Sequence, residues 1–143
     1  MSPARPPSLW ELCRALASAP APTIEAVAAQ VPATLSLVDE NEHVRFLAGG
    51  PLKLGDGTAL GGIELRVLKA TNAATLLLLE VEAPCIGLTD VRRAFPSATL
   101  TDVPRGLSEN EQAFWAVQSA KASLAFGFAE HRADCVASVA IGW

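Results

Sequence analysis

The chain has 143 residues, of which half are apolar and 18% are charged, and its formal net charge at pH 7 is −4. This length suits one domain with a substantial core, and the apolar content excludes a disordered chain. The acidic balance disfavours nucleic-acid binding, because phosphates are repelled at long range, and it favours a basic partner. The longest apolar run, Leu76–Leu79, is far too short to span a bilayer.

Two short helices are predicted near the N-terminus, after a flexible tail over residues 1–7. Ser8 and Glu11 have the spacing of a capping box, and the helix that follows presents an apolar stripe of Leu9, Leu12, Cys13 and Leu16. Thr23 is placed to cap a second helix, whose inward side we expect to be Ile24, Val27, Ala28 and Val31.

From residue 34 onward the apolar residues mostly alternate with a period of two, which is typical of strands. We expect strands over 35–38, 44–47, 63–68, 75–81, 99–103, 113–119, 123–130 and 135–143. Asp39-Glu40-Asn41-Glu42 predicts a hairpin loop and Gly55-Asp56-Gly57 a tight turn, while Thr89 caps a third helix over 90–95. Strands joined by hairpins, with the helices set apart, predict an α+β domain with an antiparallel sheet.

A weak internal duplication is visible. Pro32-Ala33-Thr34-Leu35 is echoed by Pro96-Ser97-Ala98-Thr99-Leu100, and Leu76–Glu82 is echoed by Leu124–Glu130. A cysteine follows each segment of the second echo, Cys85 after the first segment and Cys135 after the other. We therefore expect one α+β domain over residues 8–143, built from two weakly similar helix-plus-strands units over about 23–84 and about 85–143.

The three cysteines Cys13, Cys85 and Cys135 are an odd number without CxxC spacing. This usage favours reduced thiols in a cytoplasmic protein. A bridge between Cys85 and Cys135 is the one disulfide pairing that stays open. A periplasmic location is the alternative to the cytoplasm. The alanine-rich N-terminal tract is interrupted by Glu11 and Arg14, so we read it as mature protein rather than as a signal peptide.

Sites for catalysis or metal binding are weakly indicated. Cys85 or Cys135 could act as a nucleophile beside His43 or His131, but buried structural cysteines are the more frequent case. His131, Asp134 and Cys135 offer metal ligands within five positions, although a polar turn explains them more simply. We expect neither a metal nor a cofactor.

Two further patterns have ordinary explanations. The pairs Gly49-Gly50 and Gly61-Gly62 lack the context of a phosphate loop, and hairpin turns account for them. Glu80 and Glu82 point to one face of a strand and could form an acid–base pair, but solvated ends of strands are more common.

The strongest signal for a partner is a pair of acidic clusters, one of them next to an aromatic residue. An exposed ring with a charged rim is typical of a protein-binding hot spot, and Trp115 has this role if it, rather than Phe114, points outward. The candidate partner-binding residues are Asp39, Glu40, Glu42, Arg105, Glu109, Glu111 and Trp115.

The second unit, from Leu88-Thr89-Asp90-Val91 through the strands to Trp143, resembles the helix-then-sheet modules of known inhibitors. The chain is similar in layout to the tandem-repeat β-lactamase inhibitor protein, to small outer-membrane assembly lipoproteins and to immunity proteins that bacteria keep against secreted toxins, including type VI effectors. Units of the β-lactamase inhibitor are stapled by disulfides and secreted, whereas this chain has an odd cysteine.

The resemblance implies a non-catalytic immunity protein that occludes the active site of a cognate toxin, as a monomer or weak dimer without nucleic acid or membrane. A secretion chaperone for an effector is the alternative, which an obligate dimer would favour. A small-ligand carrier or enzyme, using the face lined by Ala125, Gly127 and Ala129, is the third interpretation.

Overall fold

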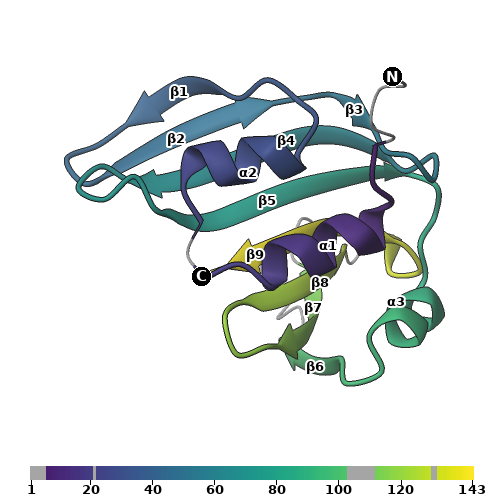
Figure 1. The fold of residues 1–143 in the computed structure, drawn as a ribbon. Coiled ribbons are helices and arrows are strands. Elements are labelled where there is room, and N and C mark those ends of the chain that lie inside the picture. The colour runs from purple at the N-terminus through teal and green to yellow at the C-terminus, as the bar shows by residue number, and fades with distance from the viewer. Residues whose placement is uncertain (1–5, 21, 103–111, 130–131) are drawn as a thin grey trace, which may run out of the picture.

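The computed structural model describes residues 6–20, 22–102, 112–129 and 132–143 (Figure 1). The elements are α1 (Leu9–Ala17), α2 (Ile24–Gln30), β1 (Ser36–Glu40), β2 (Val44–Gly49), β3 (Leu52–Lys53), β4 (Ala59–Leu68), β5 (Ala74–Ala83), α3 (Leu88–Ala94), β6 (Thr99–Asp102), β7 (Gln112–Gln118), β8 (Ser123–Ala129) and β9 (Val136–Gly142). This arrangement confirms the predicted α+β class, with N-terminal helices followed by an antiparallel sheet.

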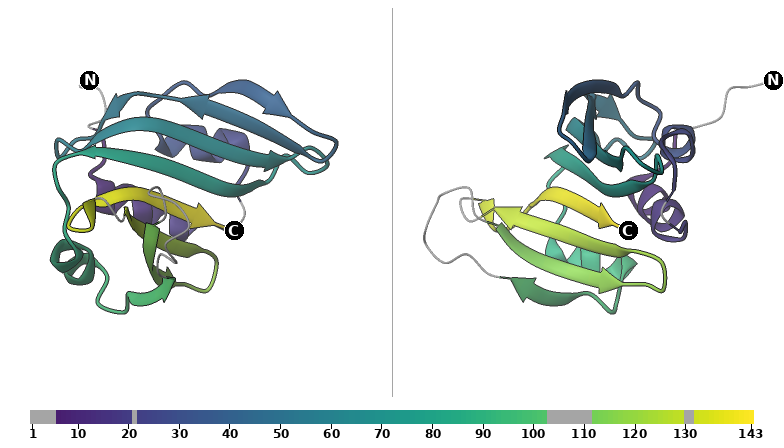
Figure 2. Two further views of the ribbon diagram at one scale, coloured as in Figure 1. Left: turned by 180° about the vertical axis from the view of Figure 1, so that it is seen from behind. Right: turned by 90° about the vertical axis from the view of Figure 1, so that its left-hand side faces the viewer.

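The sheet consists of two antiparallel meanders joined at their last strands. The strand order is β1-β2-β4-β5-β9-β8-β7-β6, with the short β3 paired to β4. Strands β1 to β5 form the first meander and β6 to β9 the second, and β5 pairs with β9 at the centre, where Leu78 lies opposite Ala140. The two units are thus continuous through one sheet, whose two parts lie at a marked angle (Figure 2).

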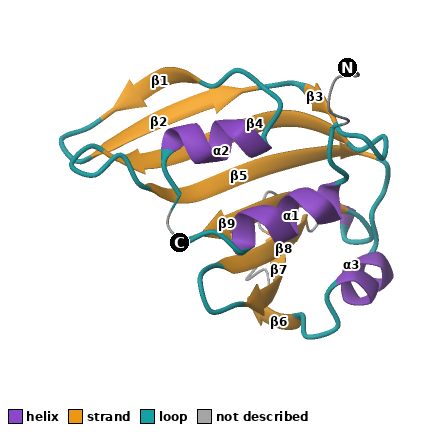
Figure 3. Ribbon diagram, in the orientation of Figure 1, coloured by secondary structure: helices purple, strands orange, loops and turns teal. Residues whose placement is uncertain are grey.

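Helices α1 and α2 lie on one side of this sheet (Figure 3), and the segment after α3 packs on the same side, where the Phe95 ring lies 5.6 Å from the Phe126 ring. On that side the residues form two buried rows, because side chains that are paired across adjacent strands share a face. One row is Leu47, Leu65, Leu77, Ile141 and Leu124, and the other is Ile63, Leu79, Val139 and Phe126. Helix α1 contacts β8 and β9, and α2 crosses the first meander.

The first helix begins as the sequence predicts. The Ser8 hydroxyl accepts a hydrogen bond from the Glu11 amide at 3.2 Å, and the Glu11 carboxylate accepts from the Ser8 amide at 3.2 Å. The predicted stripe of Leu9, Leu12, Cys13 and Leu16 is buried. At the other end of the helix, the indole of Trp143 donates to the carbonyl oxygen of Leu16 at 3.1 Å, which ties the last residue to α1.

Some local expectations need correction. The third helix begins at Leu88 rather than at Asp90, with Gly87 as its N-cap, because the Asp90 carboxylate accepts a hydrogen bond from the Gly87 amide at 3.0 Å. In α2, Ala28 is exposed rather than inward, since the short helix buries only Val27. Residues 1–5 lie outside the described part of the chain, while the Pro7 carbonyl accepts from the Gly55 amide at 2.9 Å.

The repeated segments are only partly equivalent in the fold. The echoed segments that begin at Pro32 and Pro96 each lead into the first strand of a meander, the first ending just before β1 and the second running into β6. The second echo, however, matches a segment of β5 to a segment of β8. These are the last strand of the first meander and the third strand of the second. Only the first echo therefore reflects topological equivalence.

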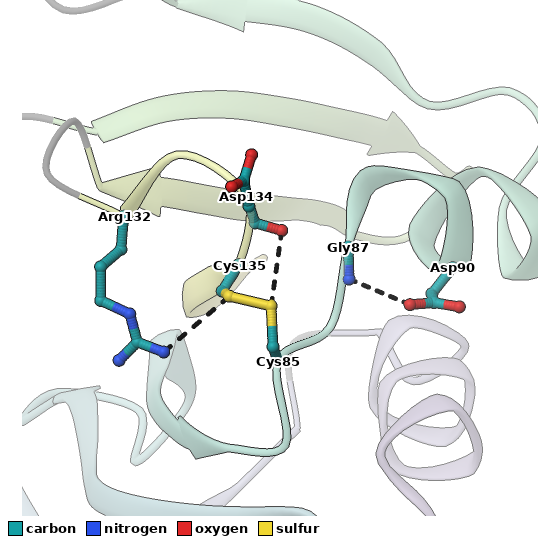
Figure 4. The surroundings of a disulfide bond; sticks show 6 residues. All are labelled: Cys85, Gly87, Asp90, Arg132, Asp134 and Cys135. Atoms are coloured by element: carbon teal, nitrogen blue, oxygen red, sulfur yellow. Dashed lines mark hydrogen bonds between the residues drawn. A yellow bond between two sulfur atoms is a disulfide. The ribbon is translucent and has the colours of Figure 1, made fainter.

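A disulfide joins Cys85 to Cys135, so the expectation of three reduced thiols is wrong for this pair (Figure 4). Cys85 follows β5 and Cys135 precedes β9, and the pairing of these two strands brings the cysteines together across 50 residues of sequence. The bridge formed is the one pairing that the sequence left open, and the pairing of β5 with β9 decides it. The bond is also not buried, since Cys85 is exposed and Cys135 is half-buried.

Candidate functional site

The first candidate surface is the β1 edge with its hairpin, which we call the acidic edge and define as residues 37–42. Every residue of β1 is exposed, and 54% of Leu37 and 62% of Val38 are accessible to solvent. A β-bulge between Leu37 and Asp39 interrupts the pairing with β2 at Val38. Apolar and acidic side chains are therefore displayed together at one end of the sheet.

This edge is held in place by polar contacts. The Glu40 carboxylate lies 3.4 Å from the Lys69 ammonium and 3.9 Å from the Arg45 guanidinium. The Asn41 side chain accepts hydrogen bonds from the amides of His43 and Val44, both at 2.9 Å, which closes the hairpin. Asp39 and Glu40 belong to β1 itself rather than to the loop that we expected, and the turn begins at Asn41.

The second acidic cluster, Glu109 and Glu111, and the candidate residue Arg105 lie outside the described residues. Trp115 lies in β7 and is half-buried against the core. It shares the helix-covered face with its cross-strand partners Leu100 and Phe126, so Phe114 is the residue on the opposite face. Trp115 is therefore not the aromatic residue of this pair that points away from the helices, which its predicted role in partner binding required.

Trp115 instead belongs to a second surface, which contains Arg14, Arg92, Phe95, Leu100 and Trp115 and which we call the arginine–aromatic surface. The Arg92 guanidinium lies 5.8 Å from the Trp115 ring, and the Arg14 guanidinium lies 5.2 Å from the Phe95 ring. Arg14 also donates to the Ala94 carbonyl at 3.1 Å, which links α1 to the end of α3.

An aromatic cluster supports this surface from below. The ring of Phe126 lies 5.8 Å from Trp10 and 5.6 Å from Phe95, and Trp10 lies 5.9 Å from Phe95. Phe126 is fully buried, whereas Trp10 and Phe95 are half-buried. The guanidinium groups are thus placed over rings whose positions are set by the core.

The candidate binding residues predicted from the sequence did not include Arg14, Arg92, Phe95 or Leu100. These residues come from α1, α3, the segment after α3 and β6, so no local spacing connects them. The one available signal was Arg92-Arg93 followed closely by Phe95, which places cations and a ring within one helical turn in an otherwise acidic chain.

The thiols are unsuited to the nucleophilic role that we considered. Cys85 and Cys135 are joined to each other, and burial raises the pKa of the Cys13 thiol to about 12, an effect that outweighs the lowering by the Arg14 charge. His43 lies in the exposed hairpin beside Glu42, and His131 lies outside the described residues. Across the described ranges, no group of three potential ligands is placed to hold a metal ion.

The small-residue stripe of β8 does not receive a helix. Leu124, Phe126 and Phe128 point to the helices, and a Cβ at Gly127 would meet the side chains of Gln112, Ser138 and Phe114 from the adjacent strands. Glu80 and Glu82 are exposed on β5 and lie over Gly62 and Gly61 of β4, which explains the absence of side chains there.

No helix in the described part of the chain has both the length and the apolar character needed to cross a membrane. Comparison of the chain with protein-family models, with curated proteins and with solved structures finds no match. The arrangement of the side chains is therefore the basis for any assignment of function.

Proposed function

We propose that this chain is a non-catalytic inhibitor that binds another protein, and specifically an immunity protein that neutralises a cognate bacterial toxin by covering its active site. The observation that carries this proposal is the acidic edge, where exposed Leu37 and Val38 stand next to Asp39 and Glu40. Exposed apolar side chains supply area that loses water on binding, and carboxylates steer a basic partner into place.

The acidic edge is suited to inhibition because it is already ordered. Arg45 and Lys69 hold Glu40, and the Asn41 side chain closes the hairpin. A surface that is ordered before binding loses less conformational entropy in the complex, which allows a small protein to bind tightly. Its carboxylates would occupy the position of an anionic substrate in the toxin.

The bulge at Val38 favours recognition through side chains over addition of a partner strand. A regular edge strand presents an even row of free amides and carbonyls, and a bulge disrupts that row. Because the bulge lies between Leu37 and Asp39, we expect the partner to contact the two apolar side chains and the carboxylates that follow them.

The disulfide leads us to place the inhibitor in an oxidising compartment such as the periplasm. Disulfides persist in such compartments and are rare in the cytosol. Alkylation of free thiols in intact cells, before lysis, distinguishes the two locations. We expect Cys85 and Cys135 to be protected from the reagent until a reductant is added.

The test pairs the chain with the product of a toxin gene adjacent to its own. We expect the purified chain to inhibit that toxin at an equimolar ratio and to restore growth of cells that express it. Asp39→Lys, which reverses a charge, together with Val38→Lys, which replaces an apolar side chain by a cation, should abolish both effects. Charge reversal by Glu82→Lys, at an exposed site on β5, should leave them intact.

Failure of the wild-type chain to bind the toxin, or equal losses in both variants, would reject the proposal. The mass of the chain in solution provides a further control, because a stable dimer without inhibition would support the secretion chaperone instead.

A further inference from the structure

We propose that the arginine–aromatic surface is a second docking site, which takes an acidic segment of a partner protein with an apolar side chain as its anchor. This inference does not depend on the proposed toxin inhibition. The acidic edge lies at the β1 end of the sheet, whereas Leu100 and Trp115 lie at the β6 end, so the two surfaces are separated by the whole strand order.

The apolar part of the site is an exposed leucine beside half-buried rings. Leu100 is 48% exposed, and it is one of the four large apolar side chains that are exposed to solvent among the described residues. Its cross-strand neighbour Trp115 and the nearby Phe95 are half-buried, so each has part of its ring surface open to solvent. An aliphatic or aromatic anchor from a partner would complete this apolar layer.

The polar part is cationic in a chain whose overall charge is negative. Within the described ranges, the ion pairs involve His43, Arg45, Arg66, Lys69 and Arg93, and none involves Arg14 or Arg92. The carboxylates on the same helices are already engaged, since Glu11 and Asp90 accept backbone hydrogen bonds at the first turns of α1 and α3. The guanidinium groups of Arg14 and Arg92 are the charges placed directly over the Phe95 and Trp115 rings, so a ligand seated on these rings would meet them.

Stacking on a ring leaves a guanidinium able to bind a carboxylate. Arg92 lies over the Trp115 ring, and Arg14 lies over the Phe95 ring. The N–H groups of a guanidinium lie in its plane and point out from its edge, so stacking of its face on a ring leaves them able to donate. A planar fork held over a ring binds a carboxylate through two parallel hydrogen bonds. Charge complementarity therefore selects an acidic segment and repels the basic partner expected at the acidic edge.

A protein segment fits this site better than an anionic membrane does. Two guanidinium groups are fewer cations than the polybasic clusters that bind anionic bilayers, and the surface exposes one large aliphatic side chain rather than a broad apolar face. A single apolar anchor flanked by carboxylates matches both features.

The test selects displayed random peptides on the intact, oxidised protein. We expect enrichment of sequences with Asp or Glu on either side of a Leu, Ile or Phe. The enriched peptides, synthesised and titrated, should bind the double variant Arg14→Gln/Arg92→Gln at least about tenfold more weakly, which corresponds to about 1.4 kcal/mol.

Arg93→Gln is the control for the Arg92 part of the double variant, because it removes one positive charge from α3 at a side chain that pairs with Asp90 and is 77% exposed. The peptides should bind this variant like the wild type. Leu100→Asp should weaken binding as the double variant does, while circular dichroism and thermal unfolding confirm that all variants are folded.

Three outcomes would overturn the inference: no peptide enrichment, enriched peptides without acidic bias, or equal affinity for the double variant and Arg93→Gln. Co-sedimentation with vesicles of phosphatidylglycerol and phosphatidylcholine supplies the last comparison. Binding to these vesicles that is lost in the double variant, without peptide binding, would reassign the surface to a membrane.

Discussion

Cys85 and Cys135 form a disulfide that links the end of β5 to the start of β9, the two strands at which the meanders join. The residues enclosed by this bond include α3 and β6 to β8, so one covalent link closes the second unit. The bond lies at the surface and leaves Cys13 as the buried free cysteine.

Removal of the bond should destabilise the fold. A closed loop of this length restricts the unfolded chain, and the chain-entropy argument predicts a loss of about 4 kcal/mol in the free energy of unfolding for Cys85→Ser/Cys135→Ser. Urea titration with and without a reductant measures this loss. The reductant should lower the midpoint of the wild type and leave that of the double variant unchanged; identical wild-type midpoints would contradict the prediction.

Cys13 should be unreactive in the folded protein. Its burial raises the thiol pKa to about 12, so almost no thiolate is present at neutral pH. A colorimetric thiol reagent should detect no thiol in the native chain, one after denaturation and three after denaturation with reduction. Rapid native labelling would show that Cys13 is accessible and would contradict its placement in the core.

Asp56 should make stability depend on pH in the acid range. Its carboxylate accepts hydrogen bonds from the amides of Leu9 and Thr58, at 3.2 and 3.1 Å. Desolvation alone would raise the pKa of Asp56, but these hydrogen bonds outweigh it and lower the pKa below 3.8. The contribution to stability is therefore complete above pH 3.8 and is lost as the pH falls through the folded-state value.

Asp56→Asn tests this dependence. We expect the variant to be less stable than the wild type by about 1 kcal/mol at neutral pH, the scale of a side-chain bond to the start of a helix, with the difference shrinking below pH 3.8. Asp134→Asn removes an exposed carboxylate and serves as the control. Thermal unfolding over this pH range would refute the prediction if the difference stayed constant.

Phe126 should be a principal residue of the core. It is fully buried and contacts the rings of Trp10 and Phe95, so Phe126→Ala should lower the free energy of unfolding by about 3–5 kcal/mol. Phe46 is half-buried on the opposite face, and Phe46→Ala should have a clearly smaller effect. Comparable losses in chemical denaturation would show that the faces are wrongly assigned.

Gly49 should not tolerate a side chain. A Cβ at this position would lie 2.5 Å from the Thr34 carbonyl oxygen and 2.9 Å from a methyl group of Leu35, and the backbone oxygen cannot move cheaply. Gly49→Ala should therefore destabilise the protein by about 1–3 kcal/mol. Gly142→Ala, whose nearest neighbour would be the Ser123 hydroxyl at 3.4 Å, should be neutral or slightly stabilising in the same unfolding assay.

Local signals in the sequence were sufficient for most of the elements. The capping box at Ser8 and the period-two alternation in 63–68 depend on neighbouring residues, and both appear in the structure as predicted. The start of α3 was misplaced because Gly87 has no side chain that marks a cap. The cap is made instead by the Asp90 carboxylate, which reaches back to the Gly87 amide.

The surfaces were less accessible to sequence reasoning. The acidic residues Asp39 and Glu40 were recognised because charge is a local property, and the structure places both on an exposed edge. The surroundings of Trp115 were not recognised, since Arg92 belongs to α3 and reaches the Trp115 ring only through tertiary packing.

The sequence by itself determined the α+β class, the positions of most helices and strands and the acidic character of the chain, because these depend on residues a few positions apart. The tertiary structure decided which strands meet, which face of β7 carries Trp115 and which cysteines are joined. Those outcomes follow from the pairing of β5 with β9 and from the packing of α1 and of the segment after α3 on one side of the sheet. Contacts between residues far apart in the chain depend on burial of the whole apolar surface, which no local pattern encodes.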